Sequence, residues 1–579
     1  MSVQKSLTLP SLAPAASLPE TIAGRLQQAV PGLWYMLFLV LYLLPGVVGH
    51  DPWKQDETYS FSMVLHILSS GDWVVPTVAG EPFMEKPPFY YLVAAGSAWL
   101  LKGWLPLHDG ARLASLLFMA LALCAVDRAG RALQPQARHA APLLLLANLG
   151  LLLHAHTLLT DIGLTAGTAL ALLGLLRLPE RPMLGAALLG SGGGMALMTK
   201  GLLIPGVLGL SIVAMALAQP AWRRHWNVRI VAATLLWAAP WLLVWPCALY
   251  LRSPELFHDW FWLNNIGRFF GFSVGQLGAA NEPGFYLRNV PWFTFPALPL
   301  AAWGLYRRRR ELPGRHDWQL LLVFSAILLA VLSRSASARA QYLLPLLPAL
   351  SLLATLGLPA GAHALRYLGR AALALSIALT GLAWLLWASI TLQLPLVPLS
   401  WLAHWLPLHY RMPVQPGAIL LALALPLLLL AAGRQLAGRL PRPLLHWVGA
   451  LALLWGSVMT LLLPWIDEAK SYRTPLVELS GELQGPAACV GRINVGESER
   501  SMLEYITGTV TKTIDPQGAA RCPQLLVGGR RRHIVEPDAR LWQLRWEGHR
   551  PGDDSELLRL YQRRNQVSAS LTGPPRSRG

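Results

Sequence analysis

Long apolar runs separated by short polar turns dominate the pattern of hydrophobic and polar positions along this chain. A helix needs about 20 consecutive, mostly apolar residues to cross a bilayer, and runs near that length recur as far as residue 463. They predict about thirteen membrane-spanning helices and therefore a polytopic α-helical membrane protein. The expected spans are 33–49, 111–126, 140–157, 160–177, 183–199, 201–218, 228–250, 291–306, 317–333, 341–358, 371–393, 417–433 and 444–463.

The apolar run 89–103 is ambiguous, because it is short and is bracketed by Pro87-Pro88 and Lys102. Arginine placement decides how to interpret it. If the N-terminus is cytoplasmic and this run lies beside the membrane, nearly every Arg cluster falls on the cytoplasmic side, as the positive-inside rule requires. The number of spans is then odd, and the C-terminal tail lies outside. The clusters are at 128–138, 177–181, 223–229, 307–315, 366–370 and 434–442.

Composition supports a membrane protein and argues against several other classes. Of 579 residues, 54% are hydrophobic and 13% are charged, whereas soluble proteins carry about 25% charged residues. The net charge of +18 would suggest nucleic-acid binding in a soluble protein, but here the arginines lie in short loops and report topology. No GxGxxG, GxxxxGK[ST] or HExxH motif occurs, so a Rossmann cofactor site, an ATPase and a zincin lack support.

The first external stretch, residues 50–110, reads as a structured loop on the membrane surface. Its sequence predicts a short amphipathic helix over Tyr59–Leu68 and a β-like run over Val74–Val78. Ionisable groups near a bilayer are costly unless they face water, a partner or a substrate, so they are functional candidates. Six Asp, Glu and Lys residues gather between Gln55 and Tyr91: Asp56, Glu57, Asp72, Glu81, Glu85 and Lys86.

The predicted topology places charges from several separate loops on the external side of the membrane. Such a collection at one face suggests a single active site there. The connection 251–290 is also external and is rich in aromatic residues and glycine, so we expect a lid over a cavity. The external polar set is Asp56, Glu57, Glu85, Lys86, Asp161, Lys200, Asn265, Arg268, Glu282, Arg334 and Arg339.

The external carboxylates allow more than one interpretation. Asp56-Glu57 could bind a metal, act as a base or cap the following helix, and Asp161 could cap the span that it opens. Two carboxylates from separate segments on one face also suit a general base and an orienting partner. His154 and His156 precede Asp161, but no further ligand cluster has metal-site spacing.

The external cations also have two interpretations. Lys86, Lys200 and Arg268 could extend their charged ends to the membrane surface while their stems lie in lipid. Several cations around one cavity would also suit an anionic phosphate group.

The composition becomes that of a soluble domain from about Trp465. Residues 465–579 predict a small external α/β domain with a disordered end, and residues 1–31 predict a disordered cytoplasmic segment. The expected strands are ACVGRINV, TVTKTI, QLLVGG and LWQLRWEG, and the expected helix is GESERSMLEYITG. Cys489 and Cys522 lie in this domain, and we expect them to form a disulfide, which needs an oxidising compartment.

An ordered series of motifs resembles one enzyme family. The series is the Asp-Glu pair at 56–57, SGDWVVPTVAGEPFMEKPP, Asp161, TKG at 199–201, GRF at 267–269 and QYLLPLLP at 341–348. It resembles the bacterial lipid A aminoarabinose transferase family of polyprenyl-phosphate-sugar-dependent membrane glycosyltransferases, which are related to the protein O-mannosyltransferases. The resemblance covers nearly the whole chain, and Gly71 to Pro88 is its most specific part.

The resemblance implies a fold, an activity and a location. It implies a transmembrane domain over 32–464 with the C-type glycosyltransferase architecture and a periplasmic α/β domain over 465–579. It implies an inverting transfer of aminoarabinose or a similar sugar from undecaprenyl phosphate to lipid A or another periplasmic envelope acceptor. The enzyme would lie in the bacterial inner membrane with its active site facing the periplasm.

The resemblance also implies roles for residues. Asp56 and Asp161 correspond to catalytic acids, and Lys86, Arg268 and Tyr342 to residues near the donor phosphate. The implied substrate-binding set is Glu57, Tyr59, Glu85, Lys86, Lys200, Arg268 and Tyr342.

Two departures lie within the implied site. Tyr59 stands where the family commonly has Arg, and Asn264-Asn265 stands where many members have a Glu-His pair. The missing His is a metal contact in the family, so a divalent metal near Glu85 is left open, and no other cofactor is expected.

Three alternatives remain at this stage. The same reaction could have a protein or polysaccharide acceptor. A lipid transporter or flippase predicts charges at mid-bilayer depth on broken helices. A structural assembly factor predicts that replacing Asp56 would be harmless.

Overall fold

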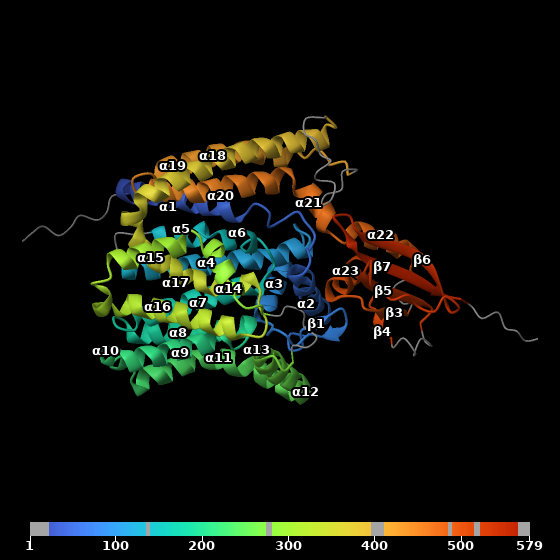
Figure 1. Cartoon of the computed structure of the whole chain (residues 1–579), viewed down its shortest axis with the longest axis horizontal. Coiled ribbons are helices and arrows are strands. Elements are labelled where there is room, and N and C mark those ends of the chain that lie inside the picture. Colours follow the sequence, from blue (N-terminus) through green and yellow to red (C-terminus); the bar gives the residue numbers. More distant parts are fainter. Residues whose placement is uncertain are drawn as a thin grey trace, which may run out of the picture.

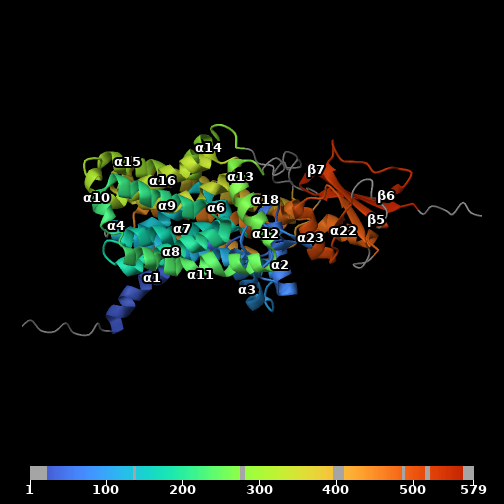
Figure 2. The ribbon, with the colours of Figure 1, turned by 90° about the horizontal axis from the view of Figure 1, so that it is seen from below.

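We examined a computed structural model of the chain, which describes residues 22–134, 139–273, 281–394, 410–484, 489–514 and 522–564. A body of roughly parallel helices forms most of the molecule, and the C-terminal domain sits at one end of it (Figures 1 and 2). The chain is a multi-pass membrane protein with a small C-terminal domain built on a mixed β-sheet.

Apolar helices of the expected length form the body. Seven helical stretches of the described residues are long and apolar enough to cross a membrane. They are α4 (Leu107–Leu133), α11 (Val228–Arg252), α16 (His316–Arg334), the stretch 340–357 made of η4, α17 and η5, α18 (Leu358–Thr391), α19 (Pro416–Leu436) and α20 (Arg442–Leu461). The other long elements of the body are α1 (Ile22–Leu43), α7 (Thr160–Arg177), α8 (Pro182–Lys200), α9 (Leu203–Ala218) and α15 (Ala297–Arg307).

Glycines allow α7 and α8 to pack closely. A Cβ at Gly167 would lie 2.8 Å from the carbonyl oxygen of Gly192, and a Cβ at Gly174 would lie 2.8 Å from that of Gly185. Small residues let helix backbones approach in a membrane, where dispersion replaces the hydrophobic driving force. This pair matters for the site, because α7 begins beside Asp161 and α8 ends at Lys200.

Several expected boundaries differ from the structure. The expected span 140–157 is divided into α5 (Ala140–Ala147) and α6 (Leu149–His154) at Asn148, whose side-chain amide donates to the carbonyl oxygens of Leu144 and Leu145. Helix α1 begins at Ile22, so residues 22–31, which we expected to be disordered, are helical. The expected disorder of residues 1–21 and of the last residues lies outside the described ranges.

The loop 50–110 contains the predicted helix. This helix, α2 (Asp56–Ser70), is longer than expected and ends at Gly71, which has a left-handed conformation with φ of 73°. The β-like run shortens to β1 (Thr77–Val78), which pairs with β2 (Glu81–Pro82). The ambiguous run 89–103 forms α3 (Phe89–Leu101), whose 13 residues are too few to cross a bilayer.

The connection 251–290 is more regular than its sequence suggested. It contains α12 (Pro254–His258), the π-helix η2 (Asp259–Gly267), α13 (Arg268–Phe270) and the start of α14 (Phe285–Phe293). Trp260 is buried, and its ring centroid lies 4.8 Å from that of Trp245 in α11. This segment is therefore a helical wall that packs on the body, and its residues 274–280 lie outside the described ranges.

The C-terminal domain contains a five-stranded sheet in the order β4-β3-β5-β7-β6. The three expected strands β3 (Val490–Ile493), β5 (Gln524–Arg530) and β6 (Trp542–Arg550) form, as does the expected helix α23 (Glu497–Thr507), while TVTKTI contributes only β4 (Lys512–Thr513). Strand β3 is parallel to β4 and β5, whereas β7 is antiparallel to both β5 and β6. The sequence analysis missed α22 (Arg473–Glu482) and β7 (Asp553–Arg563).

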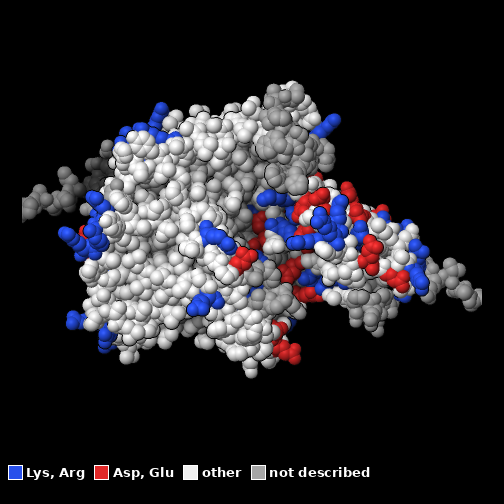
Figure 3. Space-filling view, viewed as in Figure 1, with Lys and Arg blue, Asp and Glu red and all other residues white. Residues whose placement is uncertain are grey.

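Ion pairs attach this domain to the loop 50–110. Glu81 binds Arg492 and Arg500, and Lys54 binds Glu499 and Glu556 at 3.1 and 2.6 Å. Charges of both signs gather at this junction, whereas the lateral surface of the body is largely uncharged (Figure 3). Cys489 and Cys522 are joined by a disulfide beside the sheet.

Candidate active site

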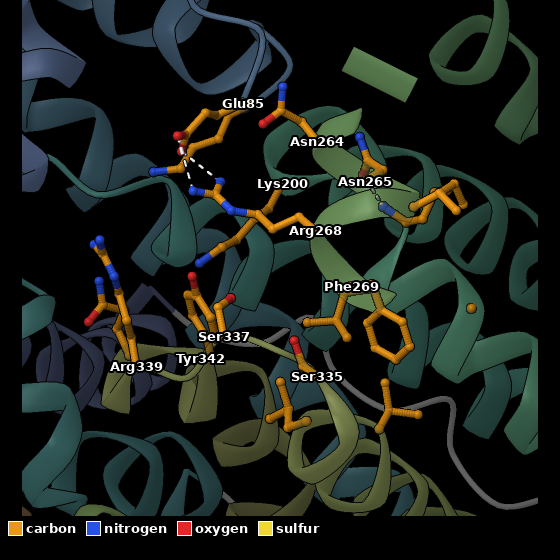
Figure 4. A pocket seen from close by; sticks show the side chains of 18 of the residues that line it. Glu85, Lys200, Asn264, Asn265, Arg268, Phe269, Ser335, Ser337, Arg339 and Tyr342 are labelled. Atoms are coloured by element: carbon orange, nitrogen blue, oxygen red, sulfur yellow. Dashed lines mark hydrogen bonds and ion pairs between the residues drawn. The ribbon is translucent and has the colours of Figure 1, made fainter. Parts of the chain in front are cut away.

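A cavity of about 570 Å³ lies where the helical body meets the C-terminal domain. Its lining comes from α2, the loop after β2, the end of α8, α9, η2, α13, the end of α16, η4 (Ala340–Leu346), the segment between α16 and η4, and the first residue of α23. Figure 4 shows Glu85, Lys200, Arg268, Arg339 and Tyr342 converging on this space from different elements. Seven predicted site residues line it: Asp56, Tyr59, Glu85, Lys86, Lys200, Arg268 and Tyr342.

Asp56 lies in the first turn of α2 and points into a cluster of donors. Its Oδ1 accepts a hydrogen bond from the Tyr59 hydroxyl, and its Oδ2 accepts one from Gln341 Nε2 at 3.0 Å. Lys86 Nζ and Arg339 Nη1 each lie 3.6 Å from the carboxylate. The side chain therefore faces the cavity, and the helix cap is Gln55, which makes no side-chain capping bond.

These donors fix the charge of Asp56. Burial raises the pKa of its carboxyl, but Lys86, the Tyr59 hydrogen bond and Arg339 together outweigh burial, so the pKa falls below its ordinary value. Asp56 is consequently an ionised carboxylate at neutral pH, held beside two cations.

Lys86 and Arg268 are two of the cations that line the cavity. Lys86 is buried and donates to the Tyr59 hydroxyl at 2.8 Å. Arg268 donates two hydrogen bonds to Glu85, at 2.7 and 3.0 Å (Figure 4). Such a bidentate pair fixes the plane of the guanidinium, so Glu85 acts by orienting Arg268.

Asp161 lies behind the cavity wall. It is buried in the first turn of α7 and forms an ion pair with Lys200 at the end of α8. Lys200 Nζ also lies 4.1 Å from the centre of the Tyr342 ring. Asp161 therefore positions Lys200, which is the residue that reaches the cavity.

Comparison with known proteins identifies relatives over most of the chain. The chain is 28% identical over 554 residues to the undecaprenyl phosphate-alpha-4-amino-4-deoxy-L-arabinose arabinosyl transferase of Pseudomonas aeruginosa (strain LESB58), covering 91% of this chain and 92% of the relative. It is 30% identical over 357 residues to arabinosyl transferase 1 of Pseudomonas fluorescens (strain Pf0-1). The chain is similar to this arabinosyl transferase family over most of its length.

The extent of the matches differs. The alignment with the P. fluorescens arabinosyl transferase covers 58% of this chain and 59% of that protein. The crystal structure of ArnT from Cupriavidus metallidurans bound to undecaprenyl phosphate superposes with a TM-score of 0.62 and 19% identity, over 96% of this chain and 100% of that one. This likeness shows a shared fold, and no family model matches the chain.

Glu57, which the resemblance placed in the substrate-binding set, makes its contacts away from the cavity. Its Oε1 accepts from Arg112 Nε at 2.9 Å and from the Leu158 amide at 2.8 Å, and its Oε2 accepts from the Trp53 amide at 3.1 Å. Arg112 is itself buried and pairs with Asp109 at 2.8 Å. Glu57 thus holds the first loop onto the body and does not line the cavity.

The residues present do not fit a divalent metal. His154 and His156 bond to backbone carbonyl oxygens at 2.6 Å, and Glu85 is engaged by Arg268. Within the described ranges, no group of three His, Cys, Asp or Glu side chains comes together. Asn264 and Asn265 turn their amide nitrogens to carbonyl oxygens of η2. No step of the chemistry below therefore passes through a metal.

Three cavity residues were not assigned a role from the sequence: Arg339, Gln341 and Glu497. Arg339 was placed on the external side by its charge and Gln341 opens the QYLLPLLP motif, but their contacts with Asp56 were not predicted. Glu497 also lines the cavity and comes from the C-terminal domain. It follows Asp56 by more than four hundred residues, so only the tertiary fold could place it there.

Proposed function

We propose that this protein is an inverting glycosyltransferase that moves aminoarabinose from undecaprenyl phosphate to lipid A. The observation that carries the proposal is the cavity that unites the ionised Asp56 with Lys86, Lys200 and Arg268. The comparisons support it, because relatives spanning nine tenths of the chain are named for this donor.

The cations suit the phosphate of the donor. Undecaprenyl phosphate leaves with a growing negative charge, and preorganised cations lower the barrier by meeting that charge where it develops. Lys86 and Arg268 are both fixed by neighbouring side chains, so little reorganisation is needed. The polyprenyl chain would lie along the apolar part of the lining, which includes Leu203, Val207, Leu210, Phe269, Phe270 and Val331.

The bond changes balance without a further reactant. An oxygen of the acceptor phosphate attacks C1 of the sugar from the face opposite the donor phosphate. The bond between C1 and the donor phosphate oxygen breaks, and its electron pair leaves with undecaprenyl phosphate. Asp56 would position the acceptor, which is already anionic, whereas for a hydroxyl acceptor it would accept the proton.

The proposal includes an orientation in the bacterial inner membrane. The Arg-rich turns lie at the end of the body far from the C-terminal domain (Figures 1 and 3), which suits about thirteen spans over 32–464 with that end in the cytoplasm. The loops 50–110 and 251–290 and the domain 465–579 would then face the periplasm. The disulfide Cys489–Cys522 supports an oxidising compartment.

The decisive experiment is transfer in detergent. Purified protein would receive a labelled panel of undecaprenyl-phosphate sugars with lipid A, beside an Asp56→Asn variant. We expect labelled lipid A with the aminoarabinose donor, and a loss of at least about 100-fold with the variant because the carboxylate beside the reacting groups is neutralised. Asp72→Asn is the matched control, since Asp72 caps a turn outside the cavity.

Other outcomes would change the proposal. If the donor is consumed but lipid A is not labelled, the proposed donor is retained and the acceptor is instead a protein or a polysaccharide. No binding or consumption of any donor by wild type would overturn the enzyme and favour a transporter or an assembly factor. An Asp56→Asn variant as active as wild type would remove Asp56 from the mechanism.

A further inference from the structure

The charges of the cavity are nearly all matched within the helical body. Asp56 lies against Lys86 and Arg339, and Glu85 is bound by Arg268. Asp161, behind the wall, is bound by Lys200. Each acidic group that the body brings to the site therefore has a cation of its own.

Glu497 is different from these acids. It lines the same cavity, yet its carboxylate makes no hydrogen bond or ion pair with any residue that the structure describes. Partial enclosure and the nearby negative charge of Glu85 raise the pKa of this carboxyl above its ordinary value. Glu497 is an exposed residue, and Arg500, Lys86 and Arg268 act on its charge without a direct contact. A carboxylate that faces a cavity without a direct partner would be stabilised by a cationic group on a ligand.

The position of Glu497 is fixed by the residues that follow it. Ser498 Oγ lies 2.9 Å from Thr58 Oγ1, Glu499 binds Lys54 at 3.1 Å, and Arg500 binds Glu81. Thr58 and Lys54 flank Asp56 in the chain by two residues on either side. Three consecutive contacts thus attach the first turn of α23 to the loop that carries Asp56.

The cavity consequently presents two kinds of recognition. Lys86 and Arg268, which belong to the helical body, provide positive charges that can bind a phosphate. Glu497, which belongs to the C-terminal domain, provides a carboxylate. A ligand with an anion at one end and a cation at the other would satisfy both. In a pyranose, C4 lies across the ring from C1, so a 4-amino sugar linked through C1 to a phosphate has this polarity.

We propose that Glu497 binds the C4 ammonium group of the donor sugar and so selects amino sugars over neutral ones. The inference rests on the proposed function, because it takes the donor to be a sugar linked to undecaprenyl phosphate. It adds a specificity residue that lies outside the transmembrane domain and outside every motif of the sequence.

The test compares two donors in purified full-length protein. One is undecaprenyl phosphate-aminoarabinose, and the other is the same donor with a hydroxyl in place of the amino group. We expect Glu497→Gln to lower kcat/KM about 10- to 100-fold for the amino donor, the size of a lost charge-assisted hydrogen bond. For the hydroxyl donor, kcat/KM should change less than about threefold, because that donor has no charge to lose.

Two further variants secure the interpretation. Glu504→Gln lies on the same helix but bonds to Ser62 outside the cavity, so both donors should react as with wild type. Glu497→Asp keeps the carboxylate and should retain a preference for the amino donor. A Glu497→Gln variant that keeps the full preference, or that loses activity equally with both donors, would overturn the assignment.

The same experiment separates this inference from the proposed function. If wild type transfers aminoarabinose but its preference does not depend on residue 497, only the role of Glu497 is wrong. If wild type transfers the hydroxyl sugar in preference to the amino sugar, both the proposed donor and the role of Glu497 are wrong.

Discussion

At the scale of single residues, neighbouring carboxylates have different uses. Successive residues on a helix point about 100° apart, so Asp56 faces the cavity while Glu57 faces the body and binds Arg112. The sequence could predict that this pair matters, because charges are costly at a membrane. It could not predict which member faces the substrate, since that depends on how α2 is rotated against its neighbours.

Arg268 provides a prediction at this scale. We expect Arg268→Lys to lower kcat/KM for the donor about 10- to 100-fold, because an ammonium cannot keep the two-bond contact with Glu85 while facing a phosphate. Steady-state kinetics with varied donor measure the change. Arg288→Lys is the control, since Arg288 is exposed and pairs with Glu282 away from the cavity. Equal kinetics for Arg268→Lys and wild type would exclude a bidentate role.

At the scale of elements, hydropathy predicted the long helices well and their interruptions poorly. Length and apolarity report a helix, but α5 ends where the Asn148 amide binds backbone oxygens, a local contact that leaves no periodic signal. The π-helix η2 is similar, because Asn264 and Asn265 each donate to a carbonyl oxygen five residues earlier. Strand β7 was missed because its polar residues hide its pairing with β5 and β6.

The hairpin of β1 and β2 gives a prediction about docking. Burial raises the pKa of the Glu81 carboxyl, but its hydrogen bonds and ion pairs with Arg492 and Arg500 together outweigh burial and lower the pKa. A lowered pKa means that the contact is present above about pH 4.5 and weakens as the pH falls below that value. We expect Glu81→Gln to speed hydrogen–deuterium exchange in α23 at neutral pH, whereas Glu282→Gln should not. Unchanged exchange in α23 would show that docking does not need Glu81.

At the scale of the whole molecule, the body and the C-terminal domain meet at a polar junction that includes Asp467 in α21 (Leu463–Lys470). Its Oδ1 accepts from the Asp51 amide at 3.1 Å and from Trp53 Nε1 at 2.8 Å. Burial, aided by Asp51, raises the pKa of Asp467 to about 6. The ionised form is therefore disfavoured in the folded protein.

This raised pKa predicts how stability changes with pH. Between its ordinary pKa and about 6, the folded protein binds more protons than the unfolded one, so stability falls as the pH rises through that window. Asp467→Asn keeps the accepting oxygen and removes the charge. At pH 8 we expect its Tm to exceed that of wild type by roughly 2 °C or more, and at pH 5 the difference should shrink. A constant difference across this range, measured by thermal unfolding in detergent, would contradict the prediction.

The shared cavity also has a consequence for biosynthesis. Asp56 and Lys86 emerge early from the ribosome. Glu497 emerges among the last hundred residues, as do Arg492 and Arg500, which form ion pairs with Glu81. A nascent chain whose transmembrane helices are all inserted still lacks the part of the cavity lining that the C-terminal domain provides. The protein thus acquires its complete site only once the C-terminal domain has folded against the helical body.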